Sequence, residues 1–151
     1  MDDLVALETW AAPLLAKLQP SALRRLTRAI AVDLRRSQTT RIGEQKDPDG
    51  APFVPRKNAG KFRGKPGRIK RRAAMFTKLR QAKFLRAESD AHSASVGFTG
   101  RTSRIARVHQ EGLEDKVSPT GPSIRYPTRR LIGFTDAERM RIRDLLLEHL
   151  A

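Results

Sequence analysis

The segment from Gly50 to Ala87 contains no aspartate or glutamate, although thirteen lysines and arginines fall between Arg56 and Arg86. A block of like charge repels itself and cannot form the core of a domain. Six prolines and glycines between residues 51 and 67 would also interrupt a helix or a central strand. We therefore predict a basic, flexible arm over residues 51–72 that becomes ordered against a polyanion. Its DNA- or partner-facing side chains are Arg56, Lys57, Lys61, Arg63, Lys65, Arg68, Lys70, Arg71 and Arg72.

The overall charge agrees with such a surface. The 151 residues carry a formal net charge of +15, which is typical of proteins that bind nucleic acid, anionic lipid or acidic protein partners. The absence of cysteine excludes disulfides and thiolate metal sites. A chain of this length is expected to form a single domain, residues 1–151, with a small core.

The chain has no feature of a secreted or membrane protein. Its start, Met1-Asp2-Asp3, is acidic where a secretory signal would be basic. Nowhere do about 18 apolar residues run together, as a membrane-spanning helix requires. We expect a soluble protein of the cytoplasm with no membrane partner.

Apolar periodicity predicts two N-terminal helices. Leucines recur at helical spacing over residues 3–18, an amphipathic helix that Pro13 should kink or divide. A second helix is predicted over residues 21–45, with Ser21 as its N-cap. Its polar face carries several arginines, which either form a solvated face or extend the basic surface. Asp47-Pro48-Asp49-Gly50 then predicts a turn that stops the helix.

The C-terminal half predicts a mixture of short elements. Residues 83–99 alternate weakly around a polar loop and indicate an antiparallel hairpin, with Phe84, Val96 and Phe98 facing inward. Further predicted elements are a helix over residues 103–111 ended by Gly112, a strand over residues 124–126, and a C-terminal helix over residues 135–150 that opens with a capping box. Residues 68–80 could also be helical. The fold class is α+β, with amphipathic helices packed on a small antiparallel sheet.

No catalytic or metal-binding constellation is visible. The three histidines, His92, His109 and His149, are far apart, and no cysteine could complete a zinc shell. There is no nucleophile elbow, and the Gly60–Pro66 loop lacks the glycine spacing and the Ser or Thr of a phosphate-binding loop. The acids near residue 111 are better explained by a surface loop than by a nuclease site. We therefore predict no enzymatic activity, no cofactor and no metal.

Several short sequence segments resemble segments of the phage virion-morphogenesis family. They occur in the same order and extend over nearly the whole length of the chain. They are Asp2-Asp3-Leu4 with Trp10, Leu34–Gln38, Asp47–Gly50, Pro55–Lys57, Met75–Arg80, Val96–Phe98, Arg104–Gln110 with Gly112, Tyr126-Pro127 and Leu131–Phe134. The resemblance implies a non-enzymatic structural protein that matures the tail and joins it to the DNA-filled head. By analogy with other neck proteins it implies a ring-forming subunit, a hexamer, around the DNA channel.

The partners implied are other copies of the chain, other neck, tail terminator, tail tube and head completion proteins, and packaged DNA. The protein would reside in the neck or tail of the virion, after assembly in the host bacterial cytoplasm. Arg104, Arg107 and His109 would line a subunit contact. The alternative hypothesis is a phage-encoded, sequence-nonspecific DNA-binding protein acting in the host cell, although few aromatic residues are available to stack on bases.

Overall fold

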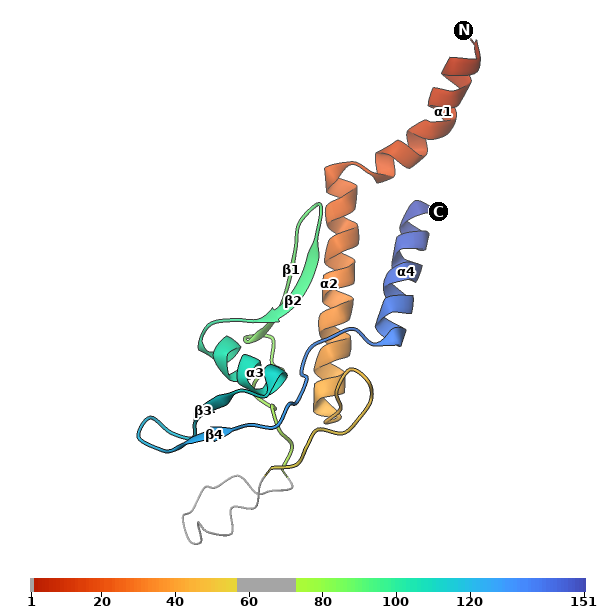
Figure 1. Cartoon of the computed structure of the whole chain (residues 1–151). Coiled ribbons are helices and arrows are strands. Elements are labelled where there is room, and N and C mark those ends of the chain that lie inside the picture. Colours follow the sequence, from red (N-terminus) through yellow and green to blue (C-terminus); the bar gives the residue numbers. More distant parts are fainter. Residues whose placement is uncertain (1, 57–72) are drawn as a thin grey trace. The chain divides into compact units, whose positions relative to one another are not determined.

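The computed structural model of the chain describes residues 2–56 and 73–151. Helices and short strands are both present, which confirms the α+β prediction. In chain order the elements are α1 (Asp2–Lys17), α2 (Pro20–Gly43), β1 (Leu85–Ser89), β2 (Ala94–Phe98), α3 (Arg101–Glu111), β3 (Glu114–Lys116), β4 (Ser123–Arg125) and α4 (Asp136–Leu150) (Figure 1).

The chain divides into two compact units. Unit 1 comprises Met1–Ser37, Arg86–Val96 and Phe134–Ala151, and unit 2 comprises Gln38–Leu85 and Gly97–Gly133. The boundary cuts α2 after Ser37 and also cuts the first hairpin, so these elements contribute residues to both units.

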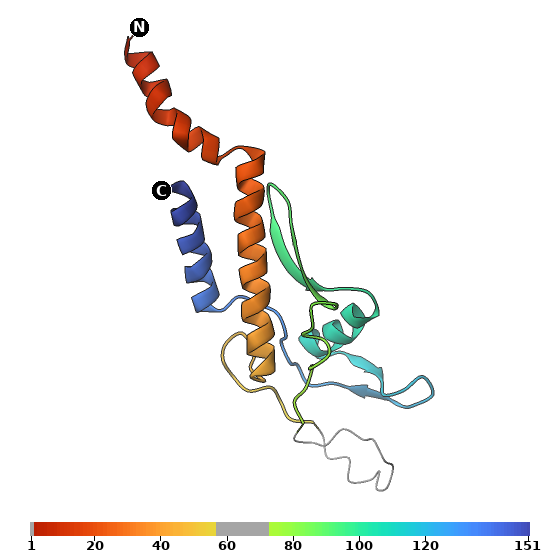
Figure 2. The ribbon, with the colours of Figure 1, turned by 180° about the vertical axis from the view of Figure 1, so that it is seen from behind.

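In unit 1, α4 lies beside the N-terminal part of α2, as both ribbon views show (Figure 1 and Figure 2). Arg141 Nε lies 3.7 Å from Asp33 Oδ2, and the Ser37 hydroxyl donates a hydrogen bond of 2.7 Å to Glu138 Oε1. Ile30, Ala31 and Leu34 form the buried side of α2. The apolar stripe of α2 therefore supplies core residues, while polar pairs hold α4 in place.

The start of α4 is fixed by local hydrogen bonds. Thr135 Oγ1 accepts from the backbone N–H of Glu138 at 3.0 Å, and Glu138 Oε2 accepts from the backbone N–H of Thr135 at 3.0 Å. This is the capping box that the sequence predicts. Since its other oxygen accepts from Ser37, the buried Glu138 carboxylate has a partner on both sides.

The start of α2 differs from the prediction. The helix begins at Pro20, and the N–H of Leu23 already donates to the carbonyl of Gln19 at 2.9 Å. Ser21 is therefore inside the first turn and is not the N-cap. Proline suits this first turn because its fixed φ is helical and its missing N–H would have had no helical acceptor.

The end of α2 leads into a tight turn. Asp47 Oδ1 accepts from the N–H groups of Asp49 at 2.9 Å and Ala51 at 3.0 Å, and Gly50 has a φ of 88°. Aspartate bonded to its own following backbone and glycine at positive φ are the features from which the sequence predicts a turn at residues 47–50.

Of the helix suggested for residues 68–80, the described part, residues 73–80, forms bends and turns and is not helical. Phe76 has a φ of 64°, which belongs to the left-handed region and interrupts any right-handed helix. Met75 and Leu79 are nevertheless buried, so these side chains anchor the segment without a helix. Ile69 lies outside the described residues.

Two two-stranded sheets are present among the described residues. The first, β1 with β2, lies where the sequence predicts a hairpin; Phe84, Val96 and Phe98 are half-buried and Leu85 is fully buried. In the second, β3 pairs antiparallel with β4, and Asp115 is opposite Ile124. Three consecutive charged residues make up β3, a composition that does not indicate a strand.

The core of unit 2 is small. Ile42, Leu85 and Leu131 are fully buried, and Phe53, Met75, Ala106 and Val108 are also buried. Gly112 ends α3 in the left-handed conformation, with φ 65° and ψ 49°, as predicted for that position. Among the described helices, none is long and apolar enough to cross a membrane.

Candidate interaction surfaces

The basic arm is described only at its edge. Of the nine predicted arm residues, Arg56 lies within the described residues, and the other eight, from Lys57 to Arg72, lie outside them. The residues on either side of this segment, 53–56 and 73–76, are described. We call these two stretches the arm root.

Arg56 joins the two sides of the arm root. Its Nη1 donates to the carbonyl of Ala73 at 2.5 Å, and its Nη2 donates to the carbonyl of Ala74 at 3.4 Å. The rings of Phe53 and Phe76 also meet edge to face, with centroids 5.5 Å apart. The described residues on the two sides of the arm, 53–56 and 73–76, are therefore held together within unit 2.

Gln45 provides a second link across the arm root. Its Oε1 accepts from the N–H of Met75 at 2.6 Å, and its Nε2 donates to the carbonyl of Met75 at 2.9 Å. The backbone carbonyl of Gln45 accepts from the N–H of Phe53 at 2.8 Å. One residue just after α2 therefore holds both sides of the root, although the sequence indicates only that the helix ends near it.

Arg129 supports the N-terminal side of the root from within unit 2. Its guanidinium is buried and donates from Nε to the carbonyl of Val54 at 2.6 Å and from Nη2 to the carbonyl of Pro55 at 3.1 Å. Burial, and secondarily the charge of Arg56, lowers the pKa of Arg129. Arginine nevertheless stays charged in proteins, so this is a buried cation held by carbonyl oxygens.

His109 lies next to Arg129, within a cluster of rings formed with Phe76 and Tyr126. Its ring lies between Phe76 and Tyr126, with centroids 4.9 Å and 5.1 Å away, and Arg129 Nη1 lies 3.2 Å from its Nδ1. Burial, and then the charge of Arg129, lowers the pKa of His109 to about 4. The ring is therefore neutral near pH 7. Since arginine can only donate, Nδ1 is the acceptor and the proton sits on Nε2.

The three residues predicted to line a subunit contact do not share one environment. The side chains of Arg104 and Arg107 are 76% and 71% exposed, and they pair with Asp115 at 2.6 Å and Glu111 at 3.4 Å. His109, by contrast, is half-buried in the aromatic cluster. The structure thus brings the two arginines to an exposed face of α3 and assigns His109 to packing.

Sequence reasoning missed Arg129 and Gln45. Both form hydrogen bonds with backbone carbonyls or N–H groups that are distant in the sequence, and neither lies in a recognisable motif.

Within residues 2–56 and 73–151, no group of three His, Asp or Glu side chains could hold a metal ion. The contacts of the arm root can hold the two ends of a basic segment in place.

A second surface lies in unit 1, where α1 exposes most of its large apolar side chains. The predicted stripe of Leu4, Leu7, Leu14, Leu15 and Leu18 is between 42% and 67% exposed, and Val5 and Trp10 are also exposed. The helix is continuous through Pro13. The predicted apolar face of α1 is thus left uncovered by residues 2–56 and 73–151.

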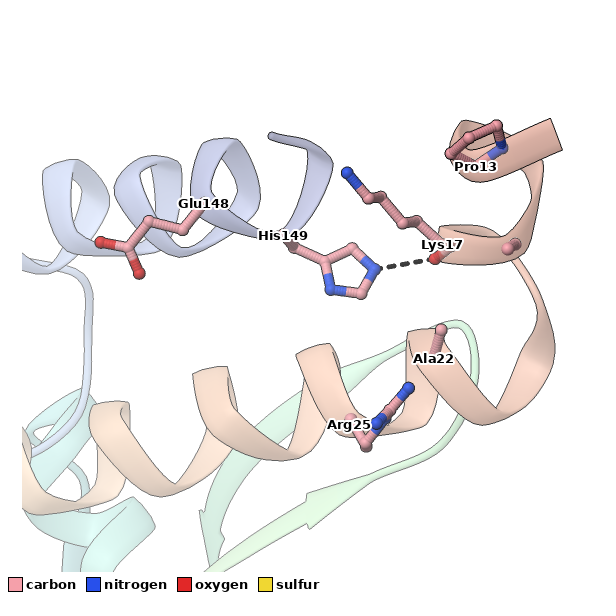
Figure 3. A pocket seen from close by; sticks show the side chains of 7 residues that line it. Pro13, Lys17, Ala22, Arg25, Glu148 and His149 are labelled. Atoms are coloured by element: carbon pink, nitrogen blue, oxygen red, sulfur yellow. Dashed lines mark hydrogen bonds between the residues drawn. The ribbon is translucent and has the colours of Figure 1, made fainter. Parts of the chain in front are cut away.

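The C-terminal ends of α1 and α4 meet beside an open pocket of about 620 Å³ (Figure 3). Lys17 Nζ donates to the carbonyls of Leu150, at 3.3 Å, and Ala151, and His149 Nε2 donates to the carbonyl of Lys17 at 2.7 Å. The pocket is lined by Pro13, Ala16, Lys17, Ala22, Arg25, Glu148 and His149.

Comparison with known proteins gives one family. The model of the phage virion morphogenesis family matches residues 2–151. Over 138 residues the chain is 41% identical to tail completion protein S of Escherichia phage P2, and the match covers 91% of this chain and 90% of that protein. No solved structure matches the chain. The similarity therefore extends over the whole fold and is not confined to one motif.

Proposed function

Since the chain belongs to the phage virion morphogenesis family, we propose that it is a non-enzymatic structural protein that completes the phage tail. The observation that carries this proposal is the 41% identity to tail completion protein S, which extends over about nine tenths of both chains. Identity at this level over nearly the full length of both chains favours a shared structural role.

In this proposal the protein forms a ring, a hexamer, around the DNA channel in the neck of the virion. It matures the tail and joins it to the head, in contact with other neck, tail terminator, tail tube and head completion proteins. It is assembled in the cytoplasm of the host bacterium and stays in the particle.

Charge supports a location next to a polyanion. Six copies with a formal charge of +15 each would carry +90. Like charges at close range destabilise an assembly unless counter-charge is near. Packaged DNA or an acidic tube rim would supply it. The arm root favours the arm as the contacting part, because Arg56, Gln45 and Arg129 fix the two described stretches between which the basic segment lies in the sequence.

Subunit contacts in the ring would include the exposed face of α3. Arg104 and Arg107 lie on this face and pair, among the described residues, with acids of their own unit, which a neighbour could replace. His109 would act indirectly, by packing under α3.

A phage that lacks this gene tests the proposal. We expect lysates with heads and with tails that fail to join, and restoration of infectious particles by the wild-type gene supplied in trans. Electron microscopy and quantitative mass spectrometry of purified particles should find the protein at a fixed low copy number. Normal infectious particles made without the gene would refute the structural role.

The acid-free basic segment favours one second candidate, a sequence-nonspecific DNA-binding protein that acts in the host cell. Contact with Z phosphates makes log affinity fall with log salt at a slope of about 0.9Z, so six contacts give a steep dependence. Tight, steeply salt-dependent binding by the purified protein, together with its absence from particles, would favour this candidate over tail completion.

A further inference from the structure

The first helix does not behave as a surface helix of a monomer. A helix on the surface of a globular protein normally exposes a polar face and buries an apolar one. In α1 and at Leu18, the residue after it, seven large apolar side chains are at least 42% exposed, and Trp10, the sole tryptophan of the chain, is 74% exposed. So much exposed apolar surface on one helix indicates a binding partner.

The exposed apolar residues can form the centre of a specific contact. They are seven large side chains, each 42–74% exposed, and an interface of standard size buries about 800 Å² per partner. Lys17, at the C-terminal end of α1, is bonded to the end of α4, and both ribbon views show α1 leading away from α2 and α4 towards its N-terminus (Figure 1 and Figure 2). The helix is anchored at one end and can reach outward with the other.

The charge of α1 indicates what it binds. Residues 1–16 contain Asp2, Asp3 and Glu8 and no lysine or arginine. Removing these three acids from the formal charge of +15 leaves +18 on residues 17–151. Two α1 helices would repel each other, whereas α1 and the body of another copy attract each other.

Unit 1 also offers a complementary surface. Arg25, Arg28, Val32 and Arg36 are exposed and follow one another at helical spacing, so they form one stripe on α2. On α4, Met140 and Leu147 are 57% and 61% exposed and lie seven residues apart, on one face of the helix. Arg25 and the small apolar residues Pro13, Ala16 and Ala22 also line the pocket (Figure 3).

We propose that α1 of one copy packs on the exposed faces of α2 and α4 in a second copy of this chain. The apolar side chains around Trp10 meet the apolar residues of α2 and α4, and the acids of α1 meet the α2 arginines. The two surfaces differ, so the contact is head-to-tail, the type that generates a ring when the rotation between neighbours closes and an open filament when it does not. The inference rests on the proposed homo-oligomer and names the contact that would build it.

Trp10 makes the contact measurable in the full-length protein. On raising the protein concentration we expect its fluorescence emission to move to shorter wavelength as the mass from light scattering increases. Leu7→Asp with Leu14→Asp should weaken self-association at least about tenfold, which corresponds to 1.4 kcal/mol. Val117→Asp, at an exposed apolar residue of unit 2, is the matched control and should assemble normally. Unchanged assembly of the α1 variant would overturn the proposal.

A charge exchange tests the choice of partner. Asp3→Arg with Glu8→Arg should weaken assembly, as should Arg28→Glu with Arg36→Glu, and mixing the two variants should restore contacts between unlike copies. Failure of the mixture to assemble, with both variants folded by circular dichroism, would overturn pairing with a second copy. The proposal would also be overturned if the protein stayed monomeric at all concentrations and another tail protein covered Trp10.

Phage complementation separates this inference from the proposed function. If a phage without the gene is defective but the Leu7→Asp, Leu14→Asp variant restores it fully, the contact is wrong and the tail role stands. If the phage without the gene is normal, the tail role itself is wrong.

Discussion

His149 Nε2 donates a hydrogen bond of 2.7 Å to the backbone carbonyl of Lys17, and Lys17 Nζ donates in return to the carbonyls at the end of α4. Each helix therefore satisfies free carbonyls at the C-terminus of the other. A cationic side chain at a helix C-terminus is also favourable for the helix dipole. These reciprocal hydrogen bonds connect Lys17, the last residue of α1, to the C-terminal end of α4.

We expect His149→Phe to loosen α1 from α4. The ring volume is kept while the donor is removed, which should lower the free energy of unfolding by about 1 kcal/mol. Urea denaturation followed by far-ultraviolet circular dichroism measures this change. His92→Phe, at an exposed position, is the control and should leave the midpoint unchanged. Equal midpoints for both variants would show that the hydrogen bond has no stabilising effect.

His109 should make the fold sensitive to acid. Its pKa is about 4 in the folded chain and 6.5 ordinarily, so between these values the unfolded chain binds the proton more strongly. The neutral His109 ring therefore makes its full contribution to the free energy of unfolding above pH 6.5. This contribution is lost as the pH falls to about 4. The ring is only half-buried, so solvent screening reduces the loss to about 1–2 kcal/mol.

His109→Phe removes this titration and keeps a ring between Phe76 and Tyr126. The variant should lose less stability between pH 7 and pH 4.5 than the wild type, as judged by urea midpoints at the two pH values. His92→Phe should follow the wild-type curve. Parallel curves for His109→Phe and the wild type would show that His109 does not titrate differently on unfolding.

Arg129→Met should destabilise unit 2 strongly. It leaves the carbonyls of Val54 and Pro55 and Nδ1 of His109 without the Arg129 donor, and a lost hydrogen bond to a charged group costs about 1.5–3 kcal/mol, less where water can replace it. We expect a loss of about 3 kcal/mol, measured by thermal or urea denaturation. Arg104→Met, at a side chain that is 76% exposed, should change stability by less than about 0.5 kcal/mol. Similar losses for the two would refute the supporting role of Arg129.

Two glycines at positive φ provide a matched pair. An alanine Cβ at Gly50, φ 88°, would meet nothing within 4 Å, whereas at Gly112, φ 65°, it would collide with Thr128 Oγ1. Gly50→Ala should therefore cost about 1–2 kcal/mol from backbone strain alone. Gly112→Ala should cost more, because Thr128 must also move. Equal losses in denaturation experiments would mean that Thr128 yields without cost.

The sequence predicts the elements whose signals are local. The capping box of Thr135 and Glu138, the turn at Asp47 and the left-handed Gly112 each depend on residues within four positions of one another. A hydrogen bond between neighbours along the chain leaves a recognisable pattern of residue types.

The arm root could not be predicted in this way. Arg129 donates to Val54, 75 residues away, and Gln45 holds Met75, 30 residues away. Such bonds use backbone groups that every residue has, so their partners leave no trace in residue type. Ser21 failed as a predicted cap for a related reason: serine favours caps, but Pro20 fits the first helical turn better.

The basic arm itself gives the most demanding prediction. Reversing Lys61, Lys65, Arg68 and Arg71 to glutamate changes the formal charge of each copy by −8, and of six copies by −48. If the arm meets packaged DNA or an acidic partner, attraction becomes repulsion, and particle yield should fall by several orders of magnitude in a complementation assay.

The matched control reverses four exposed basic residues elsewhere in unit 2, Lys46, Lys78, Arg101 and Lys116, with the same change in charge. A change in net charge alone would impair both variants equally, whereas loss of an arm interaction would impair only the arm variant.

The salt dependence of DNA binding then identifies the class of partner. If the isolated protein binds duplex DNA through the arm, the slope of log affinity against log salt should decrease by about 0.9 for each phosphate that the arm variant no longer neutralises. Full infectivity of the arm variant would refute the arm as a binding surface, whatever its charge suggests.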